Sequence, residues 1–325
     1  MRFSRWYSAG IITALGASLL TLPGGATAAD TFTVKNLVSD GFVPAATIDP
    51  NLINPWGISF APGHPFWISD NNAGVSTLYN GDGSKVPLTV NIPPPTGQTG
   101  SGTPTGTVFN ESGGFTVNGG GKSGSALFLF VTEDGAISGW SPGVNSTNAE
   151  LAVDRSNVGL GVGAVHKGLA IGDVSGSNFL YAANFRAGQV EMFDSNFNLV
   201  TTFKDPNVAA GYAPFNVRNL GGTLYVTYAL QNAAKHDDVR GAGNGYVAAF
   251  SLTGAFERRI VSLGGQINSP WSLDIAPSGF RSPGRSRADL RERAARRSSR
   301  AICGDYPTAM APPAPTPTRS ISPPG

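Results

Sequence analysis

The chain has 325 residues, including 43 Gly and 24 Pro; 14% of its residues are charged and 40% are hydrophobic. This much Gly and Pro excludes a coiled coil or a helical bundle, because both residues destabilise helix interiors. The hydrophobic content excludes a wholly disordered chain. The composition instead favours an all-β protein of many short strands and tight turns.

Residues 1–29 have the pattern of an export signal peptide. Arg2 and Arg5 precede an uncharged apolar stretch, and Ala26-Thr27-Ala28 fits a small-residue cleavage site. We therefore expect cleavage near Ala28 and Ala29, and a secreted protein that is extracellular or periplasmic. No later apolar run is long enough to cross a bilayer, so we expect no transmembrane anchor in the mature chain.

Residues 281–325 differ in composition from the rest of the mature chain. They hold nine Arg, three acidic residues and eight Pro, for a net charge of +6, whereas residues 30–280 hold twelve basic and eighteen acidic residues, for a net charge of −6. A basic, proline-rich tail is consistent with a disordered extension, with a short Arg-rich helix around 285–300, or with out-of-frame translation. We favour out-of-frame translation because the tail begins inside a repeat. A basic segment can also indicate nucleic-acid binding, but we expect no such partner for an exported protein.

No intrachain disulfide bond can stabilise the body of the protein, because Cys303 in the tail is the only cysteine. An exported chain without disulfides must depend on its own hydrophobic core. About 250 residues are enough for that.

One motif occurs four times in the body and predicts β-hairpins. In each copy an apolar strand is followed by a Gly and, five residues later, by an aromatic residue. The four pairs are Gly74 and Tyr79, Gly135 and Trp140, Gly188 and Phe193, and Gly245 and Phe250. We expect the Gly to supply the positive φ of a turn and the aromatic side chain to fill the space between sheets.

A second motif precedes most of these hairpins. Residues 55–62 (PWGISFAP) and 270–277 (PWSLDIAP) match position by position, and 166–171 and 214–217 are looser copies. Repeats of about 40–50 residues, each with three or four strands, are typical of β-propeller blades. We therefore predict that residues 30–280 form a β-propeller of four-stranded antiparallel blades, with four to five blades encoded. Residues 91–125 are expected to form a long loop with one strand around 115–117.

The two motifs together resemble NHL-repeat-like six-bladed β-propellers and, more narrowly, a family of uncharacterised exported bacterial propeller proteins. The resemblance covers roughly residues 32–280 and implies six blades. The sequence departs from the family pattern at Arg281, so the propeller is expected to be truncated or altered after residue 280.

The first strands of propeller blades line a central channel, and the residues that open these strands form one rim of it. This rim is the expected ligand site, with candidate residues Asn54, Trp56, His166, Lys167, Asn216, Asn268 and Trp271. Each candidate also has a structural interpretation, because Trp residues commonly pack between blades and Asn residues commonly cap turns. These positions supply no Asp or Glu, whereas a calcium site would need several carboxylates.

Two hypotheses about function follow. The first is a secreted propeller that binds a protein, glycan or small molecule at one rim, with no cofactor and no catalysis. The alternative is a calcium-dependent hydrolase of the lactonase or esterase type, with its site on the propeller axis. A further metal candidate is residues 235–238, whose His and two Asp lie in an insert of the fourth hairpin. The sequence leaves enzymatic activity open and favours a non-enzyme.

Overall fold

The computed structural model describes residues 34–157 and 163–275, together with one strand at 301–305. Every regular element among these residues is a β-strand. The predicted signal peptide, 1–29, and the tail 281–325 apart from 301–305 lie outside the described residues. Within the described part of the chain, no helix has the length and hydrophobicity needed to cross a membrane.

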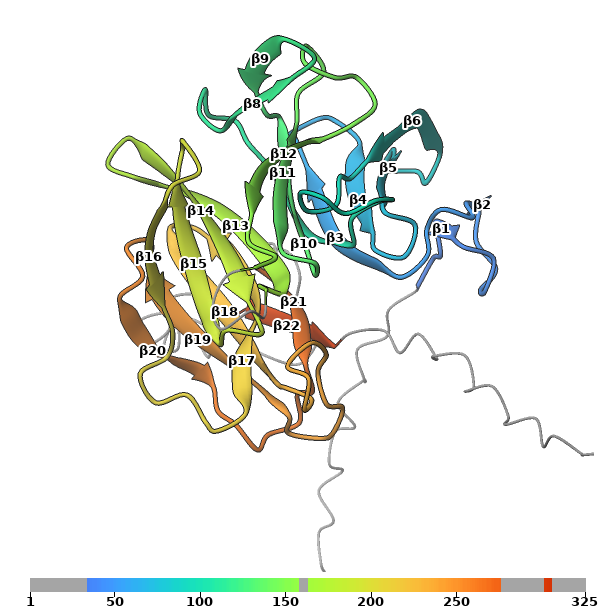
Figure 1. Cartoon of the computed structure of the whole chain (residues 1–325). Coiled ribbons are helices and arrows are strands. Elements are labelled where there is room, and N and C mark those ends of the chain that lie inside the picture. Colours follow the sequence, from blue (N-terminus) through green and yellow to red (C-terminus); the bar gives the residue numbers. More distant parts are fainter. Residues whose placement is uncertain (1–33, 158–162, 276–300, 306–325) are drawn as a thin grey trace, which may run out of the picture. The chain divides into compact units, whose positions relative to one another are not determined.

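Four antiparallel sheets of four strands follow one another along the chain (Figure 1). Blade 1 contains β3 (Pro55–Phe60), β4 (Phe66–Asp70), β5 (Val75–Tyr79) and β6 (Lys85–Asn91). Blade 2 contains β7 (Pro104–Phe109), β10 (Phe128–Thr132), β11 (Ala136–Trp140) and β12 (Glu150–Asp154). Blade 3 contains β13 (His166–Val174), β14 (Ser177–Asn184), β15 (Gln189–Asp194) and β16 (Leu199–Phe203). Blade 4 contains β17 (Tyr212–Leu220), β18 (Thr223–Leu230), β19 (Gly245–Ser251) and β20 (Phe256–Val261).

Three smaller pairs of strands complete the described elements. β21 (Pro270–Ile275) pairs antiparallel with β22 (Ala301–Asp305), so the tail contributes one strand next to the second copy of the PW motif. β1 (Val38–Ser39) and β2 (Thr47–Ile48) form a short parallel pair before blade 1. β8 (Thr116–Gly119) and β9 (Lys122–Ser125) form a hairpin inserted between β7 and β10.

The first strand of each sheet lies next to the first strand of the following sheet. β3 packs against β7, β7 against β13, β13 against β17, and β17 against β21. Apolar clusters fill the spaces between blades 1 and 2, between blades 2 and 3, and between blades 3 and 4. This arrangement is a β-propeller of four-stranded antiparallel blades, as the sequence predicts.

Glycines let the inner strands approach one another. A Cβ on Gly57 would lie 2.3 Å from the backbone oxygen of Thr105, and one on Gly106 would lie 2.6 Å from the backbone nitrogen of Leu169. A Cβ on Gly168 would lie 2.5 Å from the Cα of Asn216. Any larger residue at these three equivalent positions would push neighbouring blades apart at the axis.

The hairpin motif folds as expected in three copies and differently in the fourth. Gly74, Gly135 and Gly188 have φ values of 67°, 91° and 72°, so they supply the predicted turn conformation. The prediction is wrong for Gly245, which is the first residue of β19 and is absent from the positive-φ residues. Its lack of a side chain serves a different purpose, because a Cβ there would lie 2.4 Å from the Cδ of Pro270. All four aromatic residues of the motif are buried, namely Tyr79, Trp140, Phe193 and Phe250.

The predicted long loop at 91–125 is wrong in its middle. Residues 104–109 form β7, the inner strand of blade 2, whereas the predicted strand around 115–117 corresponds to β8. Pro104-Thr105-Gly106 occupies the place of Pro55-Trp56-Gly57 but lacks the aromatic residue, so the repeat was not visible there.

The glycine contacts predict a sharp difference between two substitutions. Gly106→Ala should lower the free energy of unfolding by about 1–3 kcal/mol, because its new methyl group meets backbone atoms that cannot rotate away. Gly143→Ala is the matched control: no atom lies within 4 Å of its Cβ position, and its effect should stay within about 0.5 kcal/mol. Urea denaturation of both variants measures the difference. Equal stabilities would contradict this account of the inner strands.

Candidate functional site

The inner strands define a channel with two unlike ends. We call the end where these strands begin, at Trp56 and Lys167, the plug rim. We call the opposite end, where Phe60 and Asp173 lie, the pocket rim. Six of the seven residues predicted for the ligand site belong to the first half of an inner strand or to the turn before it, which is the plug-rim end, and Asn216 is the middle residue of β17.

Large side chains close the channel at the plug rim. The indole rings of Trp56 and Trp271 meet edge to face with 4.7 Å between centroids, and Phe215 packs against both. The indole Nε1 of Trp271 donates a hydrogen bond of 2.9 Å to the backbone oxygen of Trp56. Strands 215 positions apart in sequence are thereby joined across the axis. The amide of Asn216 donates to the backbone oxygen of Trp271 and holds that residue in place.

A fully buried ammonium group lies beside these rings. The Nζ atom of Lys167 sits 4.6 Å from the ring centroid of Trp56 and 5.9 Å from that of Phe185. It forms an ion pair with Glu133 and lies 3.7 Å from a carboxylate oxygen of Asp237. A buried charge must be paired, and Lys167 meets this requirement with a carboxylate and aromatic faces.

Three potential metal ligands gather around this lysine. One ligand atom each from Glu133, His236 and Asp237 lies within 4.8 Å of the others. The Nδ1 atom of His236 is 2.9 Å from Asp237, and this hydrogen bond holds the pKa of Asp237 below its usual value. Glu133 also accepts a hydrogen bond of 2.9 Å from Asn71. Calcium prefers oxygen ligands only, so a set with an imidazole fits a transition metal better.

His166 faces away from the channel axis into the space between blades 2 and 3. Its Nε2 atom lies 3.0 Å from Glu191, which also accepts hydrogen bonds from Arg155 at 2.9 Å and Asn184 at 3.0 Å. Burial alone would raise the pKa of Glu191, but the hydrogen bond and charge of His166, together with Asn184 and Arg155, lower it to about 2. The positions that correspond to Glu191 in blades 1, 2 and 4 hold Thr77, Ser138 and Ala248, so none of these blades has a carboxylate there.

The predicted site residues therefore separate into four places. Trp56, Lys167, Asn216 and Trp271 meet on the axis. Asn54 lies at the plug rim, where its amide donates to Asn71 and Asn72 at 3.2 Å. His166 belongs to the blade interface, and Asn268 accepts a hydrogen bond of 2.8 Å from Gly241 in the fourth-hairpin insert.

Of the acidic groups at the plug rim, the sequence analysis named Asp237 within the metal candidate 235–238 but did not consider Glu133. Glu133 follows β10, in the place that Asn71 takes after β4. Aligning the residues after each second strand would have found it. Asp237 comes from the insert between β18 and β19, and no local pattern indicates that this insert reaches the axis.

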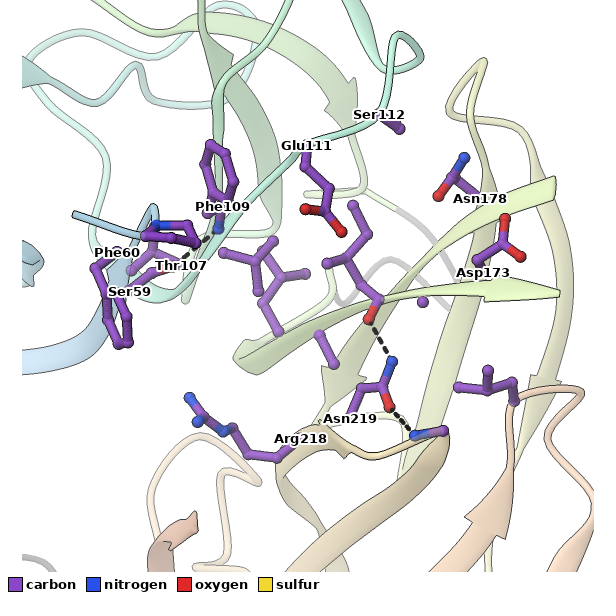
Figure 2. A pocket seen from close by; sticks show the side chains of 18 of the residues that line it. Ser59, Phe60, Thr107, Phe109, Glu111, Ser112, Asp173, Asn178, Arg218 and Asn219 are labelled. Atoms are coloured by element: carbon purple, nitrogen blue, oxygen red, sulfur yellow. Dashed lines mark hydrogen bonds between the residues drawn. The ribbon is translucent and has the colours of Figure 1, made fainter. Parts of the chain in front are cut away.

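The pocket rim holds a cavity of about 600 Å³. Its walls are the later halves of β3, β7, β13 and β17, so four blades contribute to it. Figure 2 shows Glu111 on one side of this cavity and Asp173 and Asn178 on the other, with Arg218 and Asn219 below. Apolar groups also line it, among them Ile58, Phe60, Val108 and Leu169.

A second cavity of about 80 Å³ continues this pocket toward the plug rim. Both cavities are lined by Ile58, Thr107, Leu169 and Arg218, so they lie next to each other along the inner strands. Trp56 and Trp271 line only the smaller cavity. The indole rings of Trp56 and Trp271 therefore lie at the inner end of the pocket, as its floor, and the larger cavity lies at the pocket rim.

Comparisons with known proteins identify relatives without an assigned role. No family model matches the chain. Two uncharacterised proteins of Acanthamoeba polyphaga mimivirus are 35% identical over 281 residues and 32% identical over 257 residues, covering 82% and 76% of this chain. The chain spans 66% of the length of each, just under two thirds.

Solved structures with a similar fold are more distant in sequence. Hydrazine synthase of Kuenenia stuttgartiensis is 14% identical with a TM-score of 0.47, and the alignment covers 74% of this chain and 57% of that one. Virginiamycin B lyase of Staphylococcus aureus is 15% identical with a TM-score of 0.41, covering 68% and 59%. The Dos1 propeller is 13% identical with a TM-score of 0.43, covering 70% and 54%.

The charge network of Glu191 predicts an acid-sensitive stability. A carboxyl group whose pKa is lower in the folded state stabilises the fold above its unfolded pKa, near 4.5, and loses this effect as the pH falls toward 2. Glu191→Gln should therefore lower the free energy of unfolding at pH 7 by about 3 kcal/mol. The difference from wild type should shrink as the pH falls from about 4.5 to about 2.

Urea midpoints measured between pH 2 and pH 7 test this prediction. Glu257→Gln, at an exposed position of β20, is the control and should change stability by less than about 0.5 kcal/mol. A gap between wild type and Glu191→Gln that stays constant over this range would show that the network does not act through ionisation of Glu191.

Proposed function

We propose that this protein is a non-catalytic β-propeller that binds a small polar ligand, or one polar end of a larger partner, in the pocket at the pocket rim. The observation that carries the proposal is the cavity of about 600 Å³ that is lined by residues of four blades. Ligand pockets typically measure about 300–1,000 Å³ and combine apolar walls with a few polar groups. The sequence analysis proposed the opposite rim, where side chains fill the channel.

The polar groups of the pocket support recognition rather than packing. Glu111 and Asp173 are exposed, and Arg218 is partly exposed, 3.9 Å from Asp274. Exposed charges that surround an apolar cavity can bind a ligand without first breaking buried ion pairs. Secretion, as the signal-like residues 1–29 suggest, would place this pocket in contact with extracellular or periplasmic ligands.

Blocking the pocket tests the proposal. Ile58 lines the cavity and is 51% exposed, so Ile58→Trp should fill the cavity without disturbing the core. Ile48→Trp is the control, because Ile48 is 55% exposed and lies outside the pocket. Metabolites and glycans that raise the melting temperature of wild type should raise that of Ile48→Trp equally and that of Ile58→Trp little or not at all. Equal stabilisation of Ile58→Trp would contradict the proposed site.

A metal-dependent hydrolase at the plug rim is the second candidate, because Glu133, His236 and Asp237 form a possible ligand set. The buried ammonium of Lys167 argues against it, since this group already pairs with Glu133 and lies near Asp237. A divalent cation beside the ammonium would suffer repulsion in a poorly solvated place.

Replacing Lys167 by Met, which removes the ammonium group, distinguishes the binding protein from the metal-dependent hydrolase. We expect Mn²⁺ or Ca²⁺ to leave the melting temperature of wild type unchanged and to raise that of Lys167→Met, whose acids lack a cation. Lys85→Met removes another paired lysine, bound to Asp49 at 2.6 Å, and should gain no metal response. Metal binding by wild type, with lactone or ester hydrolysis that Glu133→Gln abolishes, would instead establish the hydrolase.

A further inference from the structure

Thr107 is a buried polar residue in the deep part of the pocket. It lies on β7, the inner strand of blade 2, and lines both cavities. Its side chain is only 6% exposed, and among the described residues its hydroxyl oxygen has no hydrogen-bond partner. Native proteins rarely leave a buried hydroxyl unpaired, and in a pocket a water molecule, an ion or a ligand can supply the missing partner.

Thr105 provides an internal comparison. It lies two residues earlier on the same strand and is fully buried. Its hydroxyl donates to the backbone oxygen of His166 at 2.9 Å and lies 3.2 Å from that of Val131. One hydroxyl of β7 therefore links two blades, while the other belongs to a residue that lines the pocket and has no hydrogen-bond partner among the described residues.

The rest of the pocket limits the chemistry of the ligand. Two carboxylates, Glu111 and Asp173, and one guanidinium, Arg218, line the cavity, and Arg218 already lies 3.9 Å from Asp274, so a phosphate or another strongly anionic group would meet more repulsion than attraction. A purely apolar ligand would leave Thr107 unpaired and strip water from the charged groups. Neutral hydroxyl groups can donate to carboxylates and accept from Arg and Thr.

The floor limits the shape of the ligand. Trp56 and Trp271 close the channel, and the cavity above them has room, at about 80 Å³, for a substituent rather than for a whole ring. The ring itself would occupy the larger cavity, against Ile58 and Leu169. Because Trp56, Trp271 and Phe215 pack against one another at the inner end of the pocket, we expect a polymer to enter with its end only.

We propose that the pocket binds a neutral sugar ring end-on, with a substituent in the deep cavity hydrogen-bonded to the hydroxyl of Thr107. This inference rests on the proposed function and names its ligand class. The same chemistry is offered by a free monosaccharide and by the terminal residue of a glycan.

The test compares two isosteric variants of the full chain. Thr107→Val removes the hydroxyl and keeps the shape, so it should leave the melting temperature unchanged or raise it, because an unpaired buried polar group is removed. Thr105→Val should lower the melting temperature, because its hydrogen bonds are structural. A lower melting temperature for Thr107→Val would overturn the proposal, since it would mean that this hydroxyl has a structural partner.

Binding is then measured by calorimetry with glucose, galactose and mannose, their monodeoxy analogues, and linear trisaccharides of each. A sugar that binds wild type should bind Thr107→Val about tenfold more weakly, while Thr107→Ser should stay close to wild type. The monodeoxy analogue that lacks the hydroxyl bound by Thr107 should bind wild type and Thr107→Val equally, because it has no partner for the side chain of Thr107. Chemical modification of the hydroxyl groups on the terminal non-reducing ring of a trisaccharide should abolish binding of the trisaccharide to the wild-type protein.

Equal affinity of wild type and Thr107→Val for the intact sugar, or no binding by any of these sugars, would overturn the sugar assignment. The proposed function fails separately, if ligands of any class stabilise Ile58→Trp as strongly as wild type.

Discussion

The close approach of the inner strands at the axis is the constraint on which this structure depends. Gly57, Gly106 and Gly168 lie where each inner strand meets the next, and each has backbone or Asn216 side-chain atoms within 3 Å of the place of a Cβ. Strands this close leave a narrow channel, which two indoles and one lysine can fill at one end. The channel widens at the other end, where strand twist separates the blades. The plug and the pocket are therefore two results of one packing requirement.

Much of the fold follows from the sequence because propeller blades repeat. The Gly-to-aromatic spacing located four hairpins, and burial of Phe193 and Phe250 agrees with the role expected of the aromatic residue. β7 was missed because Thr105 replaces the aromatic residue of the PW motif, although Pro104 and Gly106 remain in register. Gly245 shows a limit of this reasoning. A glycine is needed at this position, as the motif indicates, but the reason is the close contact with Pro270 and not the geometry of a turn.

The site was less accessible to sequence reasoning. The motif placed Trp56, Lys167 and Trp271 together because they occupy equivalent positions of different blades. The motif could not indicate that these three side chains fill the channel, because filling depends on the distance between the inner strands. Asp237 reaches the axis from an insert without any repeat pattern, and Thr107 matters because of a missing partner, a property that only three-dimensional packing reveals.

The indole floor also gives the molecule an optical property. Of the five tryptophans, Trp56 and Trp271 border the deep cavity, whereas Trp67 and Trp140 pack against each other between blades 1 and 2. Polarity near an indole shifts its emission, so a molecule that displaces water above the floor should change the colour of the fluorescence from one pair and leave the other pair unaffected. The protein thus carries its own reporter of occupancy, without any attached dye.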